Sequence, residues 1–208
     1  ILERKKLMFE RKHKPQAIEG NSMDIDMTLN VRPNADFQLV IDPTVGDIIK
    51  GRGEGTLNLH INPRSNVFEM YGDYTITEGS YLFTLQNIIN KRFIIENGST
   101  IQWTGEPLDA RLNINAVYKL KTSLQPLIGT SVSSGGGDMN LNRAVPVECI
   151  INLSDRLTHP TVTFDVKVPT ADAEYQTIIA NTLNTQSAIA EQFMFLLVTN
   201  SFHSDTSG

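Results

Sequence analysis

The sequence has a single cysteine, Cys149, and only four histidines among its 208 residues. One cysteine cannot form an internal disulfide, and its place in an alternating apolar pattern is typical of a small core residue. The four histidines, at positions 13, 60, 159 and 203, lack the close spacing of metal ligands. No serine, cysteine or threonine has the context of a nucleophile elbow. The composition therefore argues against a metal centre, a cofactor site and an enzyme.

The sequence also lacks any long hydrophobic run. No apolar stretch approaches the ~20 residues that span a bilayer, so no transmembrane helix is expected. The first fourteen residues mix charged residues with no apolar centre and do not form a signal peptide. Since no initiator methionine is present, we expect a fragment of a longer chain. Targeting must therefore be inferred from other features.

Charge is distributed unevenly along the chain. The net charge is −5, but residues 1–14 hold six basic and two acidic side chains, a local charge of +4 that leaves −9 for the rest. An acidic body argues against a nucleic-acid partner. A basic segment of this kind could touch anionic lipid, although a solvated segment is the more usual case. We expect residues 1–22 to be a basic leader and connector.

Regular alternation of apolar and polar residues is the main signal in the sequence. It begins at Met23, is most extensive from Val67 to Leu120 and ends at Pro169. A period of two is typical of strands with one buried face. Glycine-containing linkers at Thr77–Ser80 and Glu96–Ser99 predict turns between neighbouring strands. The pattern predicts a mainly β domain over residues 23–169, arranged as an antiparallel meander.

Two segments depart from this alternation. Residues 122–143 are rich in serine and glycine, which predicts a long mobile loop. After Pro169 the period changes to that of helices, with Thr170 and Thr185 as expected N-caps. We therefore expect residues 170–208 to form two short helices and a tail. Glycines 51, 53 and 55 precede a strand and not a helix, so they predict a turn or bulge and no phosphate site.

The alternation alone leaves the fate of the apolar face open. The face could close into a core or remain an open gutter that offers apolar surface to a ligand. The segment from Asp109 to Lys121 would extend over ~40 Å as a strand, which is long for a compact domain and favours a curved open sheet. Asp24, Asp26 and His60 point to the opposite, solvated side.

Several motifs resemble those of a known family. These are YGDYTITEGSYLF from Tyr71 to Phe83, FIIENGSTIQWTG from Phe93 to Gly105, and LNINAVY from Leu112 to Tyr118. Together they resemble the C-terminal domain of TamB, the translocation and assembly module family of the AsmA-like superfamily. NIINKRF from Asn87 and VPTAD from Val168 are similar to its Bacteroidetes branch. The resemblance covers roughly residues 23–202.

The resemblance implies an open half-pipe, or β-taco, with an apolar interior that carries phospholipid acyl chains. It also implies a periplasmic location, an inner-membrane anchor outside this chain and an Omp85-family outer-membrane barrel as partner. The residues expected to line the lipid groove are Met23, Ile25, Met27, Leu29, Phe37, Leu39, Leu57, Leu59, Phe68, Met70, Tyr74, Ile76, Tyr81, Phe83, Leu85, Phe93, Ile95, Ile101, Trp103, Leu112, Ile114, Tyr118, Val147, Cys149, Ile151, Val162 and Phe164.

The last helix carries more apolar groups than one helical stripe needs. We expect some of them to bind a partner or to cap the groove; they are Phe193, Phe195, Leu196, Leu197 and Phe202. Three functions stay open at this point: a lipid-conducting groove, an assembly scaffold for outer-membrane barrels, and a structural or adhesive domain with a closed core.

Overall fold

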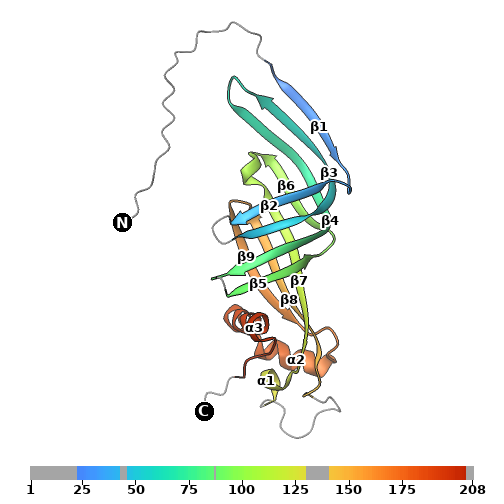
Figure 1. The fold of residues 1–208 in the computed structure, drawn as a ribbon, viewed down its shortest axis with the longest axis vertical. Coiled ribbons are helices and arrows are strands. Elements are labelled where there is room, and N and C mark those ends of the chain that lie inside the picture. Colours follow the sequence, from blue (N-terminus) through green and yellow to red (C-terminus); the bar gives the residue numbers. More distant parts are fainter. Residues whose placement is uncertain (1–22, 43–45, 87, 130–140, 205–208) are drawn as a thin grey trace, which may run out of the picture.

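The structure is a computed structural model that describes residues 23–42, 46–86, 88–129 and 141–204. Over these ranges the chain forms one antiparallel sheet of nine strands, followed by two helices at one end (Figure 1). The predicted basic leader, residues 1–22, lies outside the described residues. The strands are β1 (Ile25–Val31), β2 (Asp36–Asp42), β3 (Asp47–Asn62), β4 (Val67–Leu85), β5 (Ile89–Ile95), β6 (Ser99–Gly105), β7 (Arg111–Thr122), β8 (Val145–Arg156) and β9 (His159–Lys167).

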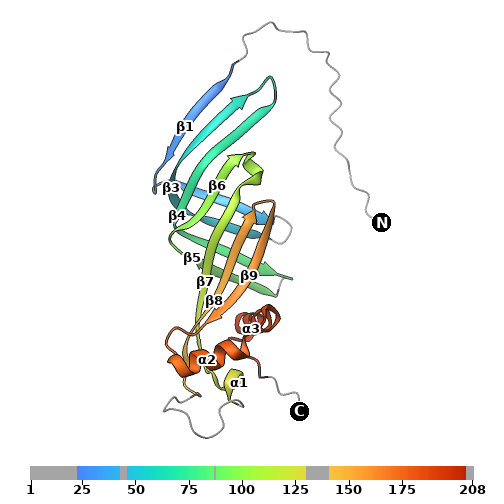
Figure 2. The same cartoon turned by 180° about the vertical axis from the view of Figure 1, so that it is seen from behind.

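Two long strands, β3 and β4, form the middle of the sheet and each borders two short strands placed in line. β1 pairs with the second half of β3 and β2 with the first half. In the same way β5 and β6 pair with the two halves of β4, and both continue onto β7. The sheet is curved and does not close into a barrel, as Figures 1 and 2 show from opposite sides. The predicted mainly β, open antiparallel fold is confirmed.

The turn predicted at Thr77–Ser80 is wrong, because β4 runs without a break through this segment. Arg52 pairs with Glu78 and Gly53 pairs with Ile76, so Thr77 is an extra residue in β4. This bulge shifts the alternation by one position, and the buried residues change from Tyr74 and Ile76 to Tyr81 and Phe83. The change of phase imitates the end of one strand and the start of another.

The turn predicted at Glu96–Ser99 is present, but it does not fold β6 back onto β5. Both strands follow the same partner, β4, on either side of the turn. The turn therefore interrupts two strands, β5 and β6, that lie end to end along β4, and it does not form a hairpin.

The Ser/Gly segment is more ordered at its start than its composition predicts. Thr122 ends β7, and a short helix, α1 (Gln125–Ile128), follows it. Leu124, Leu127 and Ile128 are buried in the core, so the predicted loop is wrong for residues 122–129. Residues 130–140 lie outside the described part of the chain.

The C-terminal helices are α2 (Ala173–Thr182) and α3 (Gln186–Thr199). Thr185 caps α3 as predicted, since its hydroxyl accepts a hydrogen bond from the Ala188 amide at 3.1 Å. The cap of α2 is Asp172 and not Thr170, because the Asp172 carboxylate accepts from the Tyr175 amide at 3.0 Å. Both helices lie at the end of the sheet opposite β1 (Figure 1).

Candidate functional site: an apolar groove that ends beneath a helix

The inner face of the sheet is mainly apolar, and its exposure changes from one end to the other. Three regions follow one another: an open end formed by β1 and the adjoining halves of β3 and β4, a pocket beside Tyr74, and a sealed end covered by α3. The outer face is polar and carries cross-strand hydrogen bonds, as between Thr28 and Asn58 at 2.9 Å. The sheet therefore has a solvated outside and an apolar inside.

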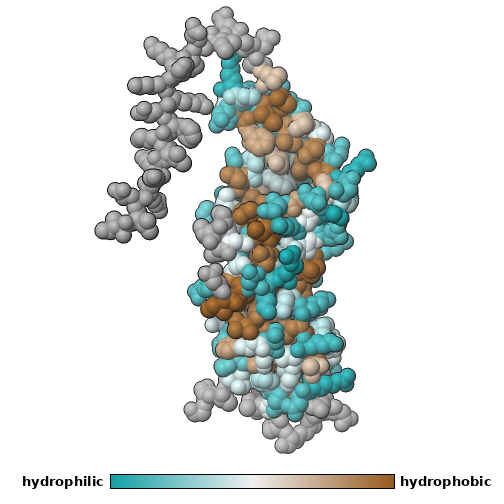
Figure 3. All heavy atoms as spheres, viewed as in Figure 1, coloured by the Kyte–Doolittle hydropathy of each residue, from teal (hydrophilic) through white to brown (hydrophobic). Residues whose placement is uncertain are grey.

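Large apolar side chains are exposed at the open end. Met23 is 64 % exposed, Met27 46 %, Leu29 44 % and Phe68 46 %. Figure 3 shows apolar surface at the end of the molecule that carries β1. Contiguous exposed apolar surface is uncommon on a soluble domain and marks a binding surface.

The Tyr74 pocket has a volume of about 240 Å³ and lies where the open end meets the core. Its lining comes from β2, β3, β4 and β6 together with the end of β1, and it comprises Val31, Ala35, Asp36, Phe37, Gln38, Leu39, Leu57, Tyr74, Ile101 and Trp103. All but Asp36 and Gln38 are apolar or aromatic. The composition fits a site for a hydrocarbon chain with a polar rim.

Glycines in β3 leave space for two aromatic rings at the pocket wall. A β-carbon at residue 53 would lie 2.8 Å from two ring carbons of Tyr74, and one at residue 51 would lie 3.2 Å from Phe37. Phe37 and Tyr74 meet edge to face with ring centroids 5.3 Å apart. The turn or bulge predicted at this glycine run is not in β3, which is continuous there; the bulge is in the neighbouring strand β4, and the glycines provide space for the aromatic wall of the pocket.

Tyr74 places a polar hydroxyl group in the apolar surroundings of this pocket. The residue is 5 % exposed, and its hydroxyl is a buried polar atom with no hydrogen-bond partner among the described residues. Burial raises the pKa of the Tyr74 phenol, so the group remains a protonated donor. By contrast, the Trp103 indole donates to the Pro107 carbonyl at 3.1 Å.

The sealed end is an aromatic cluster joined by α3. Phe193 of α3 is fully buried, with its ring centroid 4.4 Å from that of Phe164 and 6.0 Å from that of Phe93. Phe83 lies edge-on to Phe193 at 6.4 Å. These rings come from β4, β5 and β9, so α3 fills the interior where the opposite walls of the half-pipe approach each other.

The segment after α3 is fastened to the helix. The Gln192 amide donates to the His203 carbonyl at 2.9 Å and accepts from the His203 amide at 2.9 Å. The His203 ring stacks on the Phe195 ring, with their centroids 4.2 Å apart. Phe202, the residue before His203, is buried. This double hydrogen bond holds the tail against α3.

The predicted partner-binding residues are mainly buried in the interior of the folded domain. Phe193, Leu196, Leu197 and Phe202 are buried against the sheet or the tail, and Phe195 is half-buried. In this conformation they contact the groove end, whereas Val198 on α3 is 53 % exposed. Partner binding through α3 stays a prediction.

The predicted groove-lining residues divide by exposure. The exposed ones are Met23, Met27, Leu29, Phe68, Leu85 and Val162. The half-buried ones are Ile25, Phe37, Leu39, Leu59, Met70, Trp103, Tyr118 and Phe164. The buried ones are Leu57, Tyr74, Ile76, Tyr81, Phe83, Phe93, Ile95, Ile101, Leu112, Ile114, Val147, Cys149 and Ile151. Only the first two groups and the pocket residues offer surface to a ligand.

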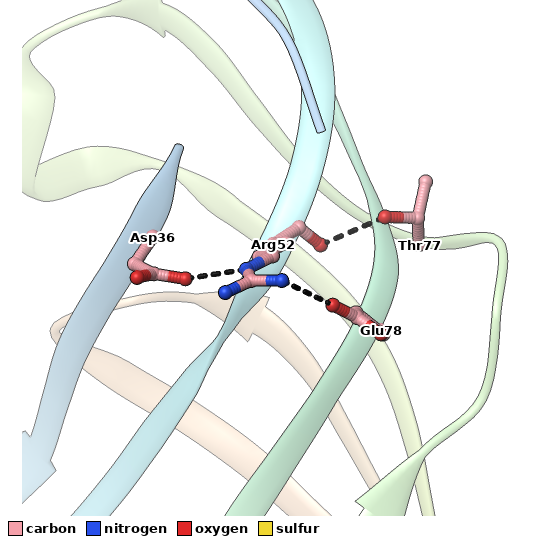
Figure 4. Close-up of polar contacts among 4 residues, drawn as sticks. All are labelled: Asp36, Arg52, Thr77 and Glu78. Atoms are coloured by element: carbon pink, nitrogen blue, oxygen red, sulfur yellow. Dashed lines mark hydrogen bonds and ion pairs between the residues drawn. The ribbon is translucent and has the colours of Figure 1, made fainter. Parts of the chain in front are cut away.

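Ionic contacts on the outer face hold the strands at the bulge. The Arg52 guanidinium lies 2.6 Å from Asp36 of β2 and 3.3 Å from Glu78 of β4 (Figure 4). The Thr77 hydroxyl donates to the Arg52 carbonyl at 3.2 Å. These groups link three strands at the point where β4 changes phase.

A buried carboxylate forms a second polar node on the inner side. Asp47 is 8 % exposed and accepts from the Tyr81 hydroxyl at 2.7 Å, and from the Thr84 amide at 2.8 Å and hydroxyl at 2.7 Å. Its oxygens are thereby satisfied within the fold. This node ties the start of β3 to the end of β4.

Sequence reasoning missed several residues of the site. Val31 and Ala35 line the pocket but are absent from the predicted set, although Val31 continues the alternation of β1. Ile49 is fully buried, but residues 45–50 show no clear period in the sequence. The signal for Val31 was therefore present, whereas Ile49 becomes recognisable only through its pairing with Tyr81.

The described residues form neither a cluster of metal ligands nor a membrane-spanning helix. No group of three or more His, Cys, Asp or Glu side chains is arranged to hold a metal ion there. Within the same part of the chain, no helix is long and apolar enough to cross a membrane.

Comparison with known proteins agrees with the fold and with the motifs. The search of curated proteins gave no match. The family model described as the TamB C-terminal domain matches residues 2–208, which is essentially the whole chain. TamB proteins serve in the translocation and assembly module of the cell envelope and in outer-membrane biogenesis. The chain therefore belongs to the TamB family, as its C-terminal domain.

Proposed function

We propose that this domain receives phospholipid acyl chains in its apolar groove as part of lipid movement between the inner and outer membranes. The observation that carries the proposal is the exposed apolar surface of the open end, which leads without a polar break into the Tyr74 pocket. A closed-core structural domain would bury these side chains. The sealed end by itself resembles such a core, but the open end does not.

The energetics of an acyl chain explain why the groove must be apolar. Each CH₂ group contributes ~0.8 kcal/mol on leaving water, so a chain of sixteen carbons contributes ~13 kcal/mol. A single charge along the path would cost a large part of this. Because α3 fills the interior beyond the pocket, the chain is held between the open end and the pocket and does not pass through the domain in this conformation.

Charge placement at Leu29 tests the groove. Leu29 is 44 % exposed and shares the apolar face, so Leu29→Asp should preserve the fold while abolishing most lipid occupancy. Asn30→Asp is the matched control, because it adds the same charge on the outer face, where residue 30 already accepts from Thr56. The measurement is mass spectrometry of lipid extracted from the purified protein.

The two outcomes of this test are distinct. Phospholipid bound to the parent and to Asn30→Asp, but lost from Leu29→Asp, supports the groove. Absence of lipid from the parent, or equal lipid content in both variants, contradicts it.

We further propose that the domain aids outer-membrane protein assembly by contacting an Omp85-family barrel, and that an inner-membrane anchor lies elsewhere in the protein. Membership of the TamB family supports both parts. The exposed side of α3 offers a contact that does not require the core to open. Val198→Asp should reduce co-purification with the barrel, and Asn181→Asp on α2 should not. Unchanged co-purification would remove α3 from the interface.

A further inference from the structure

The Tyr74 hydroxyl is the one feature of the pocket that packing does not explain. It is shielded from water and has no partner among the described residues, and leaving a buried donor without an acceptor is unfavourable. A phenylalanine would fill the same space over Gly53 at no such cost. The hydroxyl therefore suits a ligand that brings a hydrogen-bond acceptor into an otherwise apolar site.

The surroundings define the shape of that ligand. The pocket is lined by apolar side chains from five strands, and its polar rim is Asp36 and Gln38. From Tyr74 the inner face of β4 continues to Phe68 at the open end, a distance of ~20 Å at ~3.3 Å per residue. One hydrocarbon chain lying on this face would thus begin at the pocket and end at the exposed surface.

We propose that the pocket binds the carbonyl end of a single acyl chain, with the Tyr74 hydroxyl donating a hydrogen bond to the acyl carbonyl oxygen. The hydrocarbon then runs along β3 and β4 toward Phe68. This inference rests on the proposed lipid groove and adds its polarity: the carbonyl end lies at the pocket, with the headgroup beside the polar residues at its edge, and the methyl end lies at Phe68.

Access to the hydroxyl requires one side chain to move. Phe37 lies edge to face with Tyr74 and is half-buried on β2, a short strand at the edge of the sheet. A rotamer change of an interface side chain is common on binding. Phe37 is therefore the side chain that yields to the carbonyl group, while Leu57 and Ile101 keep the floor of the pocket.

An ester and an ether lysolipid of equal chain length provide the test. The probes are 1-lauroyl lysophosphatidylcholine, which has a carbonyl, and its 1-O-dodecyl ether analogue, which has none. The 208-residue chain should bind the ester about five- to tenfold more tightly, the value of one hydrogen bond. Tyr74→Phe should bind both equally, and its thermal midpoint without ligand should not fall.

The controls separate the hydroxyl from general effects. Tyr71→Phe removes a hydroxyl from the outer face, where it donates to Glu69 at 3.0 Å, and should keep the ester preference. Leu39→Trp fills the pocket and should weaken both lysolipids, which provides a test even if Tyr74→Phe folds poorly. Dodecanoate, as a third probe, shows whether a free acid or a glycerolipid ester supplies the carbonyl.

The outcomes also separate this inference from the groove itself. Equal binding of ester and ether by the parent, or an ester preference that persists in Tyr74→Phe, overturns the assignment of the hydroxyl and leaves the groove intact. Unchanged binding in Leu39→Trp overturns the pocket as the site. No binding of any lysolipid by the parent overturns both the inference and the proposed groove.

Discussion

Truncation of Phe193 tests whether α3 seals the groove. The side chain is fully buried, and its ring lies 4.4 Å from Phe164 and 6.0 Å from Phe93. Phe→Ala substitutions in cores cost about 3–5 kcal/mol, including the cavity that remains. We expect a loss of about 3 kcal/mol in the free energy of unfolding, at the low end, because β9 is an edge strand and can shift toward the empty space.

Urea denaturation followed by circular dichroism measures this loss. With a slope of about 2 kcal/mol/M, the midpoint should fall by about 1.5 M. The control is Val198→Ala, on the exposed side of the same helix, which should change stability by less than about 0.5 kcal/mol. A loss below about 1 kcal/mol for Phe193→Ala would refute the description of α3 as a packed seal.

Two further predictions concern titratable groups. Burial raises the pKa of the Cys149 thiol to about 12, so in the native protein at pH 8 this thiol should not react with a disulfide reagent. The urea-unfolded chain should react fully. Rapid reaction of the native protein would contradict the buried placement of Cys149. The hydrogen bond from His60 to Asp26 raises the pKa of His60 in the folded protein. The small stabilisation from this pair is therefore complete below about pH 6.5, the pKa of His60 in the unfolded chain, and disappears as pH rises through the pKa of His60 in the folded protein. An NMR titration should show the His60 pKa falling in Asp26→Asn, and an unchanged value would refute the pairing.

The fold was largely predictable because a period of two survives in almost every strand. The prediction failed where the period changes phase, because the extra residue Thr77 made one long strand look like two. It also failed at α1, because the composition of the following Ser/Gly segment obscured the buried Leu124, Leu127 and Ile128. Local pattern identifies strands well, but a bulge becomes visible only in the register with the neighbouring strand.

The sequence predicts which side chains of the candidate site share the inner face, but not how deeply each of them is buried. Alternation identifies which side chains share the inner face, yet it contains no information on what covers them. Thus Leu29 and Ile114 have the same pattern, although the first is 44 % exposed and the second is fully buried. The excess of apolar groups on α3 has a similar explanation, since the helix is covered by strands on one side and by its own tail on another.

The bulge at Thr77 also limits how the length of β4 can change. Since it offsets the two halves of the strand by one residue, it allows Tyr74 and Tyr81, seven positions apart, to face the same interior. Loss of Thr77 would remove the bulge and leave Tyr74 and Tyr81 an even number of positions apart, so both side chains would still face the interior of a regular strand. Loss of one residue between Phe68 and Tyr74, where β4 pairs one to one with β3, would turn Phe68 to the outer face, so a single-residue deletion in β4 should be tolerated far better at Thr77 than there.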